Sequence, residues 1–137
     1  RTGNVLFVGQ LERIGVRPRC LRYYLLSERY RHRHDFAMEG FRKRICICDR
    51  TRKLISRLRR GAGTGGGGGF GKTIALELVR GFESAMDDDL DTGLAFRRIS
   101  RATAKIEDAL ENGRLSGKDA ETILRAMERI DTVMGVF

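Results

Sequence analysis

The sequence predicts a mainly α-helical protein, in which an antiparallel helical bundle follows a small basic segment. Apolar residues recur at intervals of three and four through most of the chain, which is the spacing of one face of an α-helix. The 137 residues include no Trp and one Pro, and only 7% are aromatic, a composition that favours helices over a β-sandwich. A hydrophobic content of 41% suffices for a core, and the short connections between the expected helices are typical of antiparallel bundles.

Two short elements are expected before residue 31. The apolar run of residues 5–8 (Val-Leu-Phe-Val) suits either a brief strand or the start of a first helix, and Gly15 ends the turn that follows. Pro18 then suits the first position of a helix that should continue to about Tyr30. The inner face of this helix should carry Leu21, Tyr24 and Leu25.

A longer helix is expected over residues 38–60. One stripe of this segment carries apolar residues at steps of three, four or seven, namely Phe41, Ile45, Cys48, Ile55 and Leu58. The opposite face consists almost entirely of Arg and Lys. This segment therefore predicts an amphipathic helix with a cationic outer side.

Positive charge is concentrated in the first 60 residues. They hold 17 Lys and Arg against 5 Asp and Glu, a net charge of +12, whereas residues 61–137 carry a net charge of −3. Arginine makes bidentate contacts with phosphate groups, so this block predicts a polyanionic partner. The alternative is a solvated face without a ligand, but an excess of this size repels itself unless a partner neutralises it.

Glycine supplies eight of the eleven residues from Gly61 to Gly71, which predicts a flexible linker between a basic segment, residues 1–60, and a helical bundle, residues 72–137. Three helices are expected in the bundle. The first carries apolar residues at helical spacing from Ile74 to Met86. The second begins at the cap Asp91-Thr92 and stops at Asn112-Gly113, and the third begins at the capping box Ser116-x-x-Asp119.

The glycine run also contains a formal match to a phosphate-binding P-loop, Gly66-x-x-x-x-Gly71-Lys72-Thr73. A P-loop needs a buried strand before it, which holds the loop in place for the phosphates. Residues 55–60 form a basic helical segment instead of a strand. Because eight glycines generate this pattern easily, a plain linker is the preferred interpretation over nucleotide binding.

Metal binding is not expected. Pairing His32 and His34 with Cys46 and Cys48 would form a zinc site, but residues two apart on a helix point about 200° away from each other. Residues 87–91 include four Asp, yet they lack the Gly and the bidentate Glu of a calcium loop. Acidic residues ahead of a helix stabilise its dipole, which explains this run without a ligand. The three cysteines are expected to be reduced thiols, as in the cytoplasm.

No catalytic arrangement emerges from the sequence. The two His lie in the Arg-rich stretch of residues 30–34, where a hydrated role facing phosphate is favoured over general-base chemistry. Aromatic residues interleaved with this basic block suit occasional packing on bases or ribose, namely Tyr23, Tyr24, Tyr30 and Phe36. The competing interpretation places them in the core, and for Tyr24 and Phe36 it is preferred.

Two groups of residues resemble the region that follows the KMSKS loop in cysteinyl-tRNA synthetases, a family of class I aminoacyl-tRNA synthetases. The first group reads Gly3-Asn4, Leu21-Arg22, Leu25-Leu26-Ser27, Tyr30-Arg31 and Asp35-Phe36. The second is Met86-Asp87-Asp88-Asp89-Leu90-Asp91-Thr92, which is similar to the family's MDDDxNTP, and Ile130-Asp131-x-x-Met134-Gly135-Val136 resembles the end of its bundle. The chain departs from the family at three positions, because Arg29, Ala37 and Gly93 replace a His, a capping Ser or Thr, and a Pro.

The resemblance implies that residues 1–60 form the stem-contact region and residues 72–137 the anticodon-binding helical bundle of such an enzyme. The family's Rossmann domain, HIGH motif, zinc ligands and signature lysines would lie upstream of Arg1. No catalytic residue, cofactor or metal is therefore expected in this chain. It would be part of a cysteine–tRNA ligase if the natural protein extends upstream, or otherwise a free-standing relative of that enzyme that binds tRNA. The implied partners are tRNA, in particular the cysteine-accepting tRNA, and the upstream catalytic domain, in the cytoplasm.

Two alternatives to tRNA binding stay open. A cysteine ligase paralogue of the mycothiol pathway shares this layout and the start Gly-Asn-x-x-Phe-Val, and a non-catalytic protein-interaction bundle would need no RNA. A long Arg face favours tRNA, because a neutral amino sugar does not require it. The residues expected to contact RNA are Arg22, Arg29, Arg31, Arg33, Arg42, Lys43, Arg44, Arg50 and Lys53.

Overall fold

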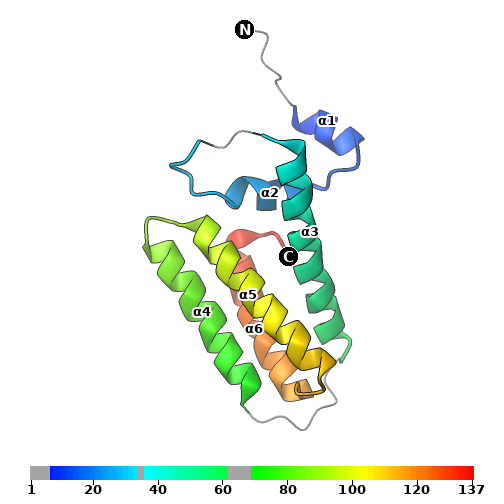
Figure 1. Ribbon diagram of the computed structural model, residues 1–137, viewed down its shortest axis with the longest axis vertical. Coiled ribbons are helices and arrows are strands. Elements are labelled where there is room, and N and C mark those ends of the chain that lie inside the picture. Colours follow the sequence, from blue (N-terminus) through cyan, green and yellow to red (C-terminus); the bar gives the residue numbers. More distant parts are fainter. Residues whose placement is uncertain (1–6, 34–35, 62–68) are drawn as a thin grey trace.

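The computed structural model describes residues 7–33, 36–61 and 69–137, and all regular structure within these ranges is helical. The helices are α1 (Val8–Arg13), α2 (Pro18–Leu26), α3 (Met38–Arg59), α4 (Phe70–Asp87), α5 (Thr92–Glu111) and α6 (Gly117–Met134) (Figure 1). The predicted fold class is therefore confirmed. None of the helices described combines the length and the apolar character that crossing a membrane would require.

The first two helices are shorter than α3, and the second ends earlier than expected. Val8, the last residue of the apolar run, opens α1, while residues 5 and 6 lie outside the described ranges. Pro18 occupies the first turn of α2 as predicted, but the helix stops at Leu26. The prediction for Leu25 is wrong, since its side chain is 59% exposed. Positions three and four apart share one helical face, and the buried face of α2 consists of Cys20, Tyr23 and Tyr24.

The long helix α3 follows the prediction closely. It covers Met38–Arg59, and its buried face carries Phe41, Cys48, Thr51, Leu54, Ile55 and Leu58. Ile45, which was expected on the same stripe, is half-buried. The helix packs against α2, α5 and α6.

The helices α4, α5 and α6 alternate in direction, as the bundle prediction requires (Figure 1). Their predicted caps are confirmed. Asp91 Oδ1 accepts the backbone N–H of Leu94 at 2.7 Å at the start of α5, and Ser116 and Asp119 form the capping box of α6. Gly113, with φ of 62°, follows the end of α5.

The start of α4 includes the last two residues of the expected linker. Residues 62–68 lie outside the described ranges, but Phe70 and Gly71 are helical. The backbone N–H of Gly71 donates to Asp119 Oδ1 at 2.9 Å, so the start of α4 is bonded to the start of α6. Because this contact orders the chain, the helix begins earlier than the glycine content suggests.

The basic segment and the bundle share one hydrophobic core. Ile74, Ile99, Ile123 and their neighbours in α4, α5 and α6 form the centre of this core. The same cluster includes side chains from α2 and α3, namely Tyr23, Cys48, Leu54, Ile55 and Leu58. The apolar face of α3 therefore lies on the bundle, and its cationic face points outward.

Candidate nucleic-acid interface

The outer side of α3 and the start of α2 border a strongly basic groove of about 780 Å³. Asp49 is the one acidic residue among the groove's described lining. The cations of the lining are Arg17, Arg19, Arg52, Lys53, Arg57, Arg59 and Arg60. On α3, Lys53 and Arg57 lie four residues apart and Arg52 and Arg59 lie seven apart, spacings of about one and two helical turns that place each pair on the same side of the helix.

A second hollow, of about 620 Å³, lies beside the groove along α3. Both hollows are lined by Asp49, Lys53 and Arg57, which follow one another at steps of four residues and so form a ridge between them. The second hollow adds Arg42 and Arg50 from α3 and Glu107 from α5. The two hollows together present a predominantly cationic surface, which is the chemistry that a phosphate backbone requires.

Part of this surface has no internal counter-charge. Arg52, Lys53 and Arg57 form no ion pair with any residue that the structure describes. At the edges of the groove, Arg17 lies 3.7 Å from Asp49 and Arg59 lies 3.2 Å from Glu128, in exposed pairs of little strength. The middle of the cationic face is therefore the part best placed to meet an external anion.

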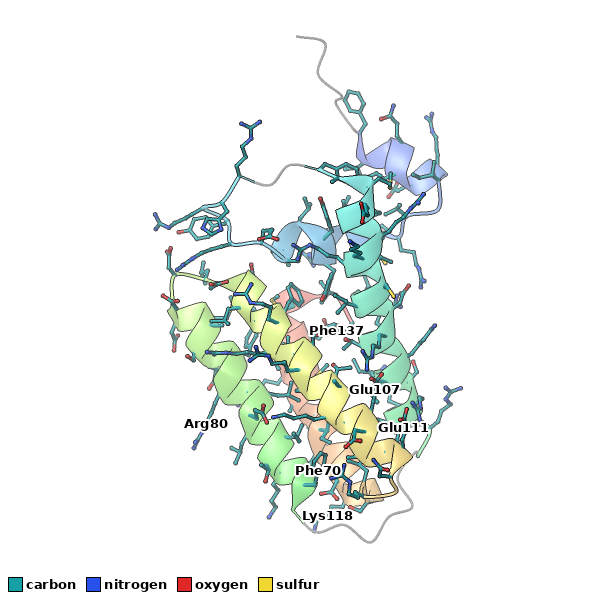
Figure 2. The ribbon with its side chains drawn as sticks, in the orientation of Figure 1. Phe70, Arg80, Glu107, Glu111, Lys118 and Phe137 are labelled. Carbon is teal, nitrogen blue, oxygen red and sulfur yellow. The ribbon has the colours of Figure 1, made fainter. Side chains whose placement is uncertain are left out.

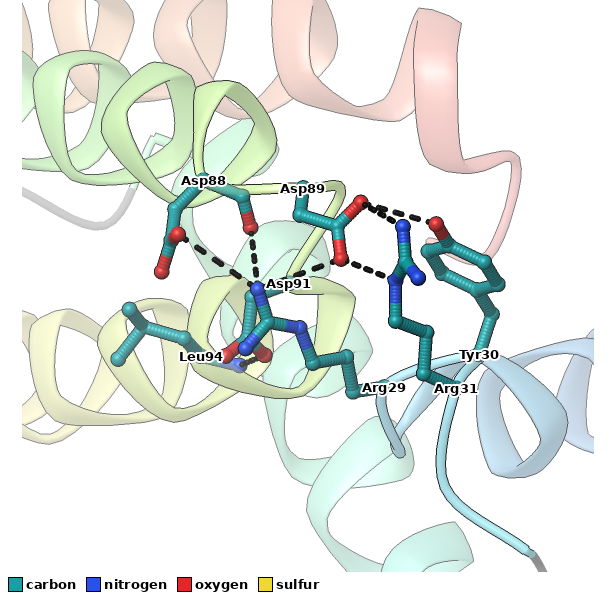
Figure 3. A network of polar contacts seen from close by, with 7 residues as sticks. All are labelled: Arg29, Tyr30, Arg31, Asp88, Asp89, Asp91 and Leu94. Atoms are coloured by element: carbon teal, nitrogen blue, oxygen red, sulfur yellow. Dashed lines mark hydrogen bonds and ion pairs between the residues drawn. The ribbon is translucent and has the colours of Figure 1, made fainter.

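The arginines of the arm that follows α2 (residues 29–31) bond to acidic residues of this chain, unlike the cations in the middle of the groove. Arg31 donates through two nitrogens to the carboxylate of Asp89, and Tyr30 Oη donates to the same carboxylate at 2.9 Å (Figure 3). Arg29 Nη2 donates to the carbonyl oxygen of Asp88 at 3.1 Å. The hydrogen bonds from Arg31 and Tyr30 lower the pKa of Asp89 below its ordinary value. Arg29 and Arg31, both expected to contact RNA, thus hold the turn between α4 and α5.

Three more of the expected RNA contacts form ion pairs within the chain. Arg44 pairs with Glu28 and donates to the carbonyl of Ser27 at 3.2 Å. Arg50 Nε donates to Glu107 at 2.6 Å, and Glu107 lies on the side of α5 that faces α3 (Figure 2). Lys43 pairs with Glu39 one turn earlier in α3, and both side chains are mostly exposed.

The remaining expected contacts are Arg22, Arg33, Arg42 and Lys53, all of which have exposed side chains. Arg42 and Lys53 line the cationic hollows, whereas Arg22 lies near Gly135 at the end of α6. The structure therefore brings together only part of the expected set. It adds several residues that the site prediction omitted, namely Arg17, Arg19, Arg52, Arg57, Arg59 and Arg60. Placing residues 52–60 on a helical wheel would have found four of them.

The aromatic residues of the basic segment divide between the core and the surface. Tyr30 is 61% exposed. Tyr23 and Tyr24 are buried, and the ring of Tyr24 meets those of Phe36 and Phe41 edge-on at 5.5 and 5.1 Å between centroids. The core interpretation is thus confirmed for Tyr24. Phe36 is 39% exposed, although it packs on Tyr24 and Phe41.

The described residues do not favour the zinc or P-loop interpretations. Cys46 is exposed while Cys48 is fully buried, so they face opposite ways, and burial raises the pKa of the Cys48 thiol to about 12. No group of three His, Cys, Asp or Glu suited to a metal occurs in the described ranges, which exclude His34. Gly71, whose N–H a P-loop would direct at phosphate, donates it to Asp119 instead. Gly66 lies outside the described ranges.

Comparisons with known proteins agree on one family, although no protein-family model matches the chain. The cysteine–tRNA ligase of Desulforudis audaxviator is 34% identical over 142 residues, which cover 98% of this chain and 30% of the relative. The cysteine–tRNA ligase of Koribacter versatilis is 25% identical, and the match covers 98% of this chain and 27% of the relative. The cysteine–tRNA ligase of Nitratidesulfovibrio vulgaris is 30% identical, and the match covers 90% of this chain and 27% of the relative.

The chain thus spans about three tenths of the length of the curated relatives that it matches. The matches extend over nearly all of this chain, across both the basic segment and the bundle. The helical architecture agrees with the resemblance in the two motifs. The chain belongs to the cysteine–tRNA ligase family and corresponds to the C-terminal helical region of these enzymes.

Proposed function

We propose that the chain binds tRNA, as the part of a cysteine–tRNA ligase that holds the RNA and carries no catalytic residue. The observation that supports this most directly is the cationic groove on α3, which has seven basic residues against one carboxylate. A surface of this kind binds polyanions, because each phosphate that it neutralises releases condensed counterions. The cysteine-accepting tRNA and a cytoplasmic location follow from the family as part of the same proposal.

The nine residues expected to contact RNA divide into two roles under this proposal. Arg42, Lys43 and Lys53 on α3 contact phosphates directly, as do the exposed Arg22 and Arg33. Arg29, Arg31 and Arg50 act mainly through ion pairs that fix the basic segment on the bundle. Arg44 acts mainly through its pair with Glu28, which lies within the basic segment. Arg52 and Arg57 join the direct contacts because they lie beside Lys53 and form no ion pair with a described residue.

The rest of a ligase is the protein partner in this proposal. Val8, Leu21 and Leu25 border an apolar hollow of about 310 Å³ between α1 and α2, and Val8 and Leu25 are 56% and 59% exposed. Exposed apolar patches mark interaction surfaces. Val8 belongs to α1, the first helix that the structure describes, so the upstream catalytic domain is the proposed occupant of this patch.

The decisive experiment measures the affinity for a cysteine-tRNA transcript by fluorescence anisotropy across a salt series. The variant Arg52→Gln/Lys53→Gln/Arg57→Gln should bind about 10- to 100-fold more weakly at low salt. The negative slope of the logarithm of its association constant against the logarithm of the salt concentration should become less steep by about two. The matched control is Arg80→Gln/Lys118→Gln/Arg125→Gln, which removes three charges from α4 and α6. Arg80 and Lys118 project away from α3 (Figure 2).

Two results would contradict the proposal. One is an affinity that does not change with salt or that is no better than for a random duplex. The other is an equal loss in the control variant, which would assign the effect to net charge alone. Binding of an amino sugar that tRNA does not compete with would favour the mycothiol-type ligase instead.

A further inference from the structure

A smaller pocket, of about 340 Å³, lies between the end of α2, α3 and α5. It shares no described lining residue with the cationic groove on α3. The polar side chains that matter for its chemistry are Tyr23, Glu28, Arg44, Arg97, Ser100 and Arg101. Three guanidinium groups therefore surround one cavity together with a single carboxylate.

The charges of this pocket are not balanced. Glu28 pairs with Arg44 and neutralises it. Arg97 and Arg101 lie four residues apart on α5, and neither forms an ion pair with a residue that the structure describes. Like charges at this spacing destabilise a helix, because the two side chains lie on the same face. An anion held between the two arginines would remove this repulsion.

Tyr23 is a buried residue whose hydroxyl has no hydrogen-bond partner among the described residues. The residue is 4% exposed, and its ring packs on Phe96 with 4.3 Å between centroids. No described residue forms a hydrogen bond with Tyr23 Oη. Arg29 Nε is the one fully enclosed side-chain N or O atom among the described residues that lacks a hydrogen-bond partner, so Tyr23 Oη keeps some exposure. Tyr23 also lines the pocket.

Two further features suit an anionic ligand at this place. Burial raises the pKa of Tyr23 to about 12, so the phenol stays protonated and acts as a hydrogen-bond donor at neutral pH. Gly93 has no side chain to fill the floor of the pocket, where a Cβ would lie 3.1 Å from the carbonyl oxygen of Ser27 and 3.4 Å from Arg97 Nη1. Donors and cations therefore converge on one open space.

We propose that this pocket binds a phosphate group, held by the guanidinium groups of Arg97 and Arg101 and by the hydroxyls of Tyr23 and Ser100. Bidentate arginine contacts and neutral hydroxyl donors are the usual ligands of a phosphate. The volume admits a phosphate with a small attached group such as a ribose. The phosphate comes either from an RNA backbone or from a free phosphate monoester. The site does not depend on RNA binding by the groove on α3.

The first experiment follows thermal unfolding of the 137-residue chain in sodium phosphate and in sodium chloride of equal ionic strength. Phosphate should raise the melting temperature of the parent chain and of the control Arg80→Gln/Arg125→Gln, but not of Arg97→Gln/Arg101→Gln. Tyr23→Phe keeps the ring on Phe96 and removes only the hydroxyl. It should weaken phosphate binding about 5- to 10-fold with an unchanged circular dichroism spectrum.

The second experiment identifies the source of the phosphate. If the source is RNA, Arg97→Gln/Arg101→Gln and Tyr23→Phe weaken tRNA binding more than the control variant does. If it is a free monoester, ribose 5-phosphate binds the parent chain and not these variants, and tRNA affinity is unchanged. Either result supports phosphate binding in this pocket.

Phosphate binding should also survive Arg52→Gln/Lys53→Gln/Arg57→Gln. A failure of the proposed tRNA binding by the groove can therefore be distinguished from a failure of the proposed phosphate binding by the pocket. No stabilisation by phosphate, or equal stabilisation in every variant, overturns the proposal.

Discussion

Among the described glycines, Gly71 has the least room for a side chain. A Cβ at this position would lie 2.5 Å from the Cα of Asp119, closer than packed atoms allow. Asp119 also accepts the Gly71 N–H and completes the cap of α6 with Ser116, and these hydrogen bonds lower its pKa. The sequence offers Gly71 only as the last glycine of a run, so its packing role could not be distinguished from linker composition.

Replacing Gly71 by Ala should therefore destabilise the protein, although alanine is the better helix former. We expect Gly71→Ala to lower the free energy of unfolding by about 1–3 kcal/mol, because the starts of α4 and α6 must move apart. The matched control is Gly40→Ala in α3, where a Cβ meets nothing within 4 Å. It should raise stability by about 0.5–1 kcal/mol. Urea unfolding checks both, and similar shifts in the two variants would contradict this view of Gly71.

At the scale of elements, the turn between α4 and α5 is strained and externally supported. Asp89 and Leu90 both have φ of 53°, a region that residues other than glycine rarely adopt. Their conformation is held by the arm after α2, which donates hydrogen bonds from Arg29, Tyr30 and Arg31 to Asp88 and Asp89 (Figure 3). The arm and the turn are far apart in sequence, so neither the strain nor its compensation was visible in the pattern of residues.

The charge of Asp89 should contribute stability that depends on pH. Asn tolerates positive φ, so Asp89→Asn removes the charge and keeps the backbone preference. Because the folded pKa of Asp89 is lowered, its contribution is present above the ordinary Asp pKa of about 4 and is lost as pH falls through the lowered value. The melting temperature of the parent should exceed that of Asp89→Asn at pH 7, and the difference should shrink below about pH 4.

A control separates this effect from general loss of a surface charge. Glu121→Gln breaks an exposed pair with Arg125 inside α6 and should change the melting temperature less. A difference between the parent and Asp89→Asn that is the same at pH 3 and pH 7 would show that the carboxylate has no such role. Hydrogen exchange of the amides around residues 88–91 gives a second, local readout.

How well each helix could be predicted depends on whether its apolar spacing and its caps are local in sequence. Helices α3 to α6 were predicted closely because spacing and caps, such as Asp91 and Ser116, are local in sequence. The end of α2 was missed because Leu25 and the residues after it lack a stop signal. The candidate site was only partly predictable, since charge density cannot show which arginines are paired with Asp89, Glu28 or Glu107.

The whole molecule joins a basic and an acidic half through two kinds of contact. Leu54, Ile55 and Leu58 of α3 belong to the core of the bundle. Ion pairs such as Arg50 with Glu107 and Arg59 with Glu128 cross the same boundary. Buried apolar area stabilises more than exposed pairs do, so the core is the stronger of the two links. We therefore expect the two halves to form one folding unit despite the charge division along the sequence.

We expect the basic segment and the bundle to unfold in one cooperative transition. All three tyrosines lie in the first 60 residues and the chain has no Trp, so tyrosine fluorescence reports on the basic segment while far-ultraviolet circular dichroism reports on all helices. The two urea curves should coincide. Leu54→Ala creates a cavity at a side chain that is 2% exposed and should lower the unfolding free energy by about 2–4 kcal/mol, moving both curves together. A helical signal that persists after the tyrosine transition would instead mean that α4–α6 fold without α3.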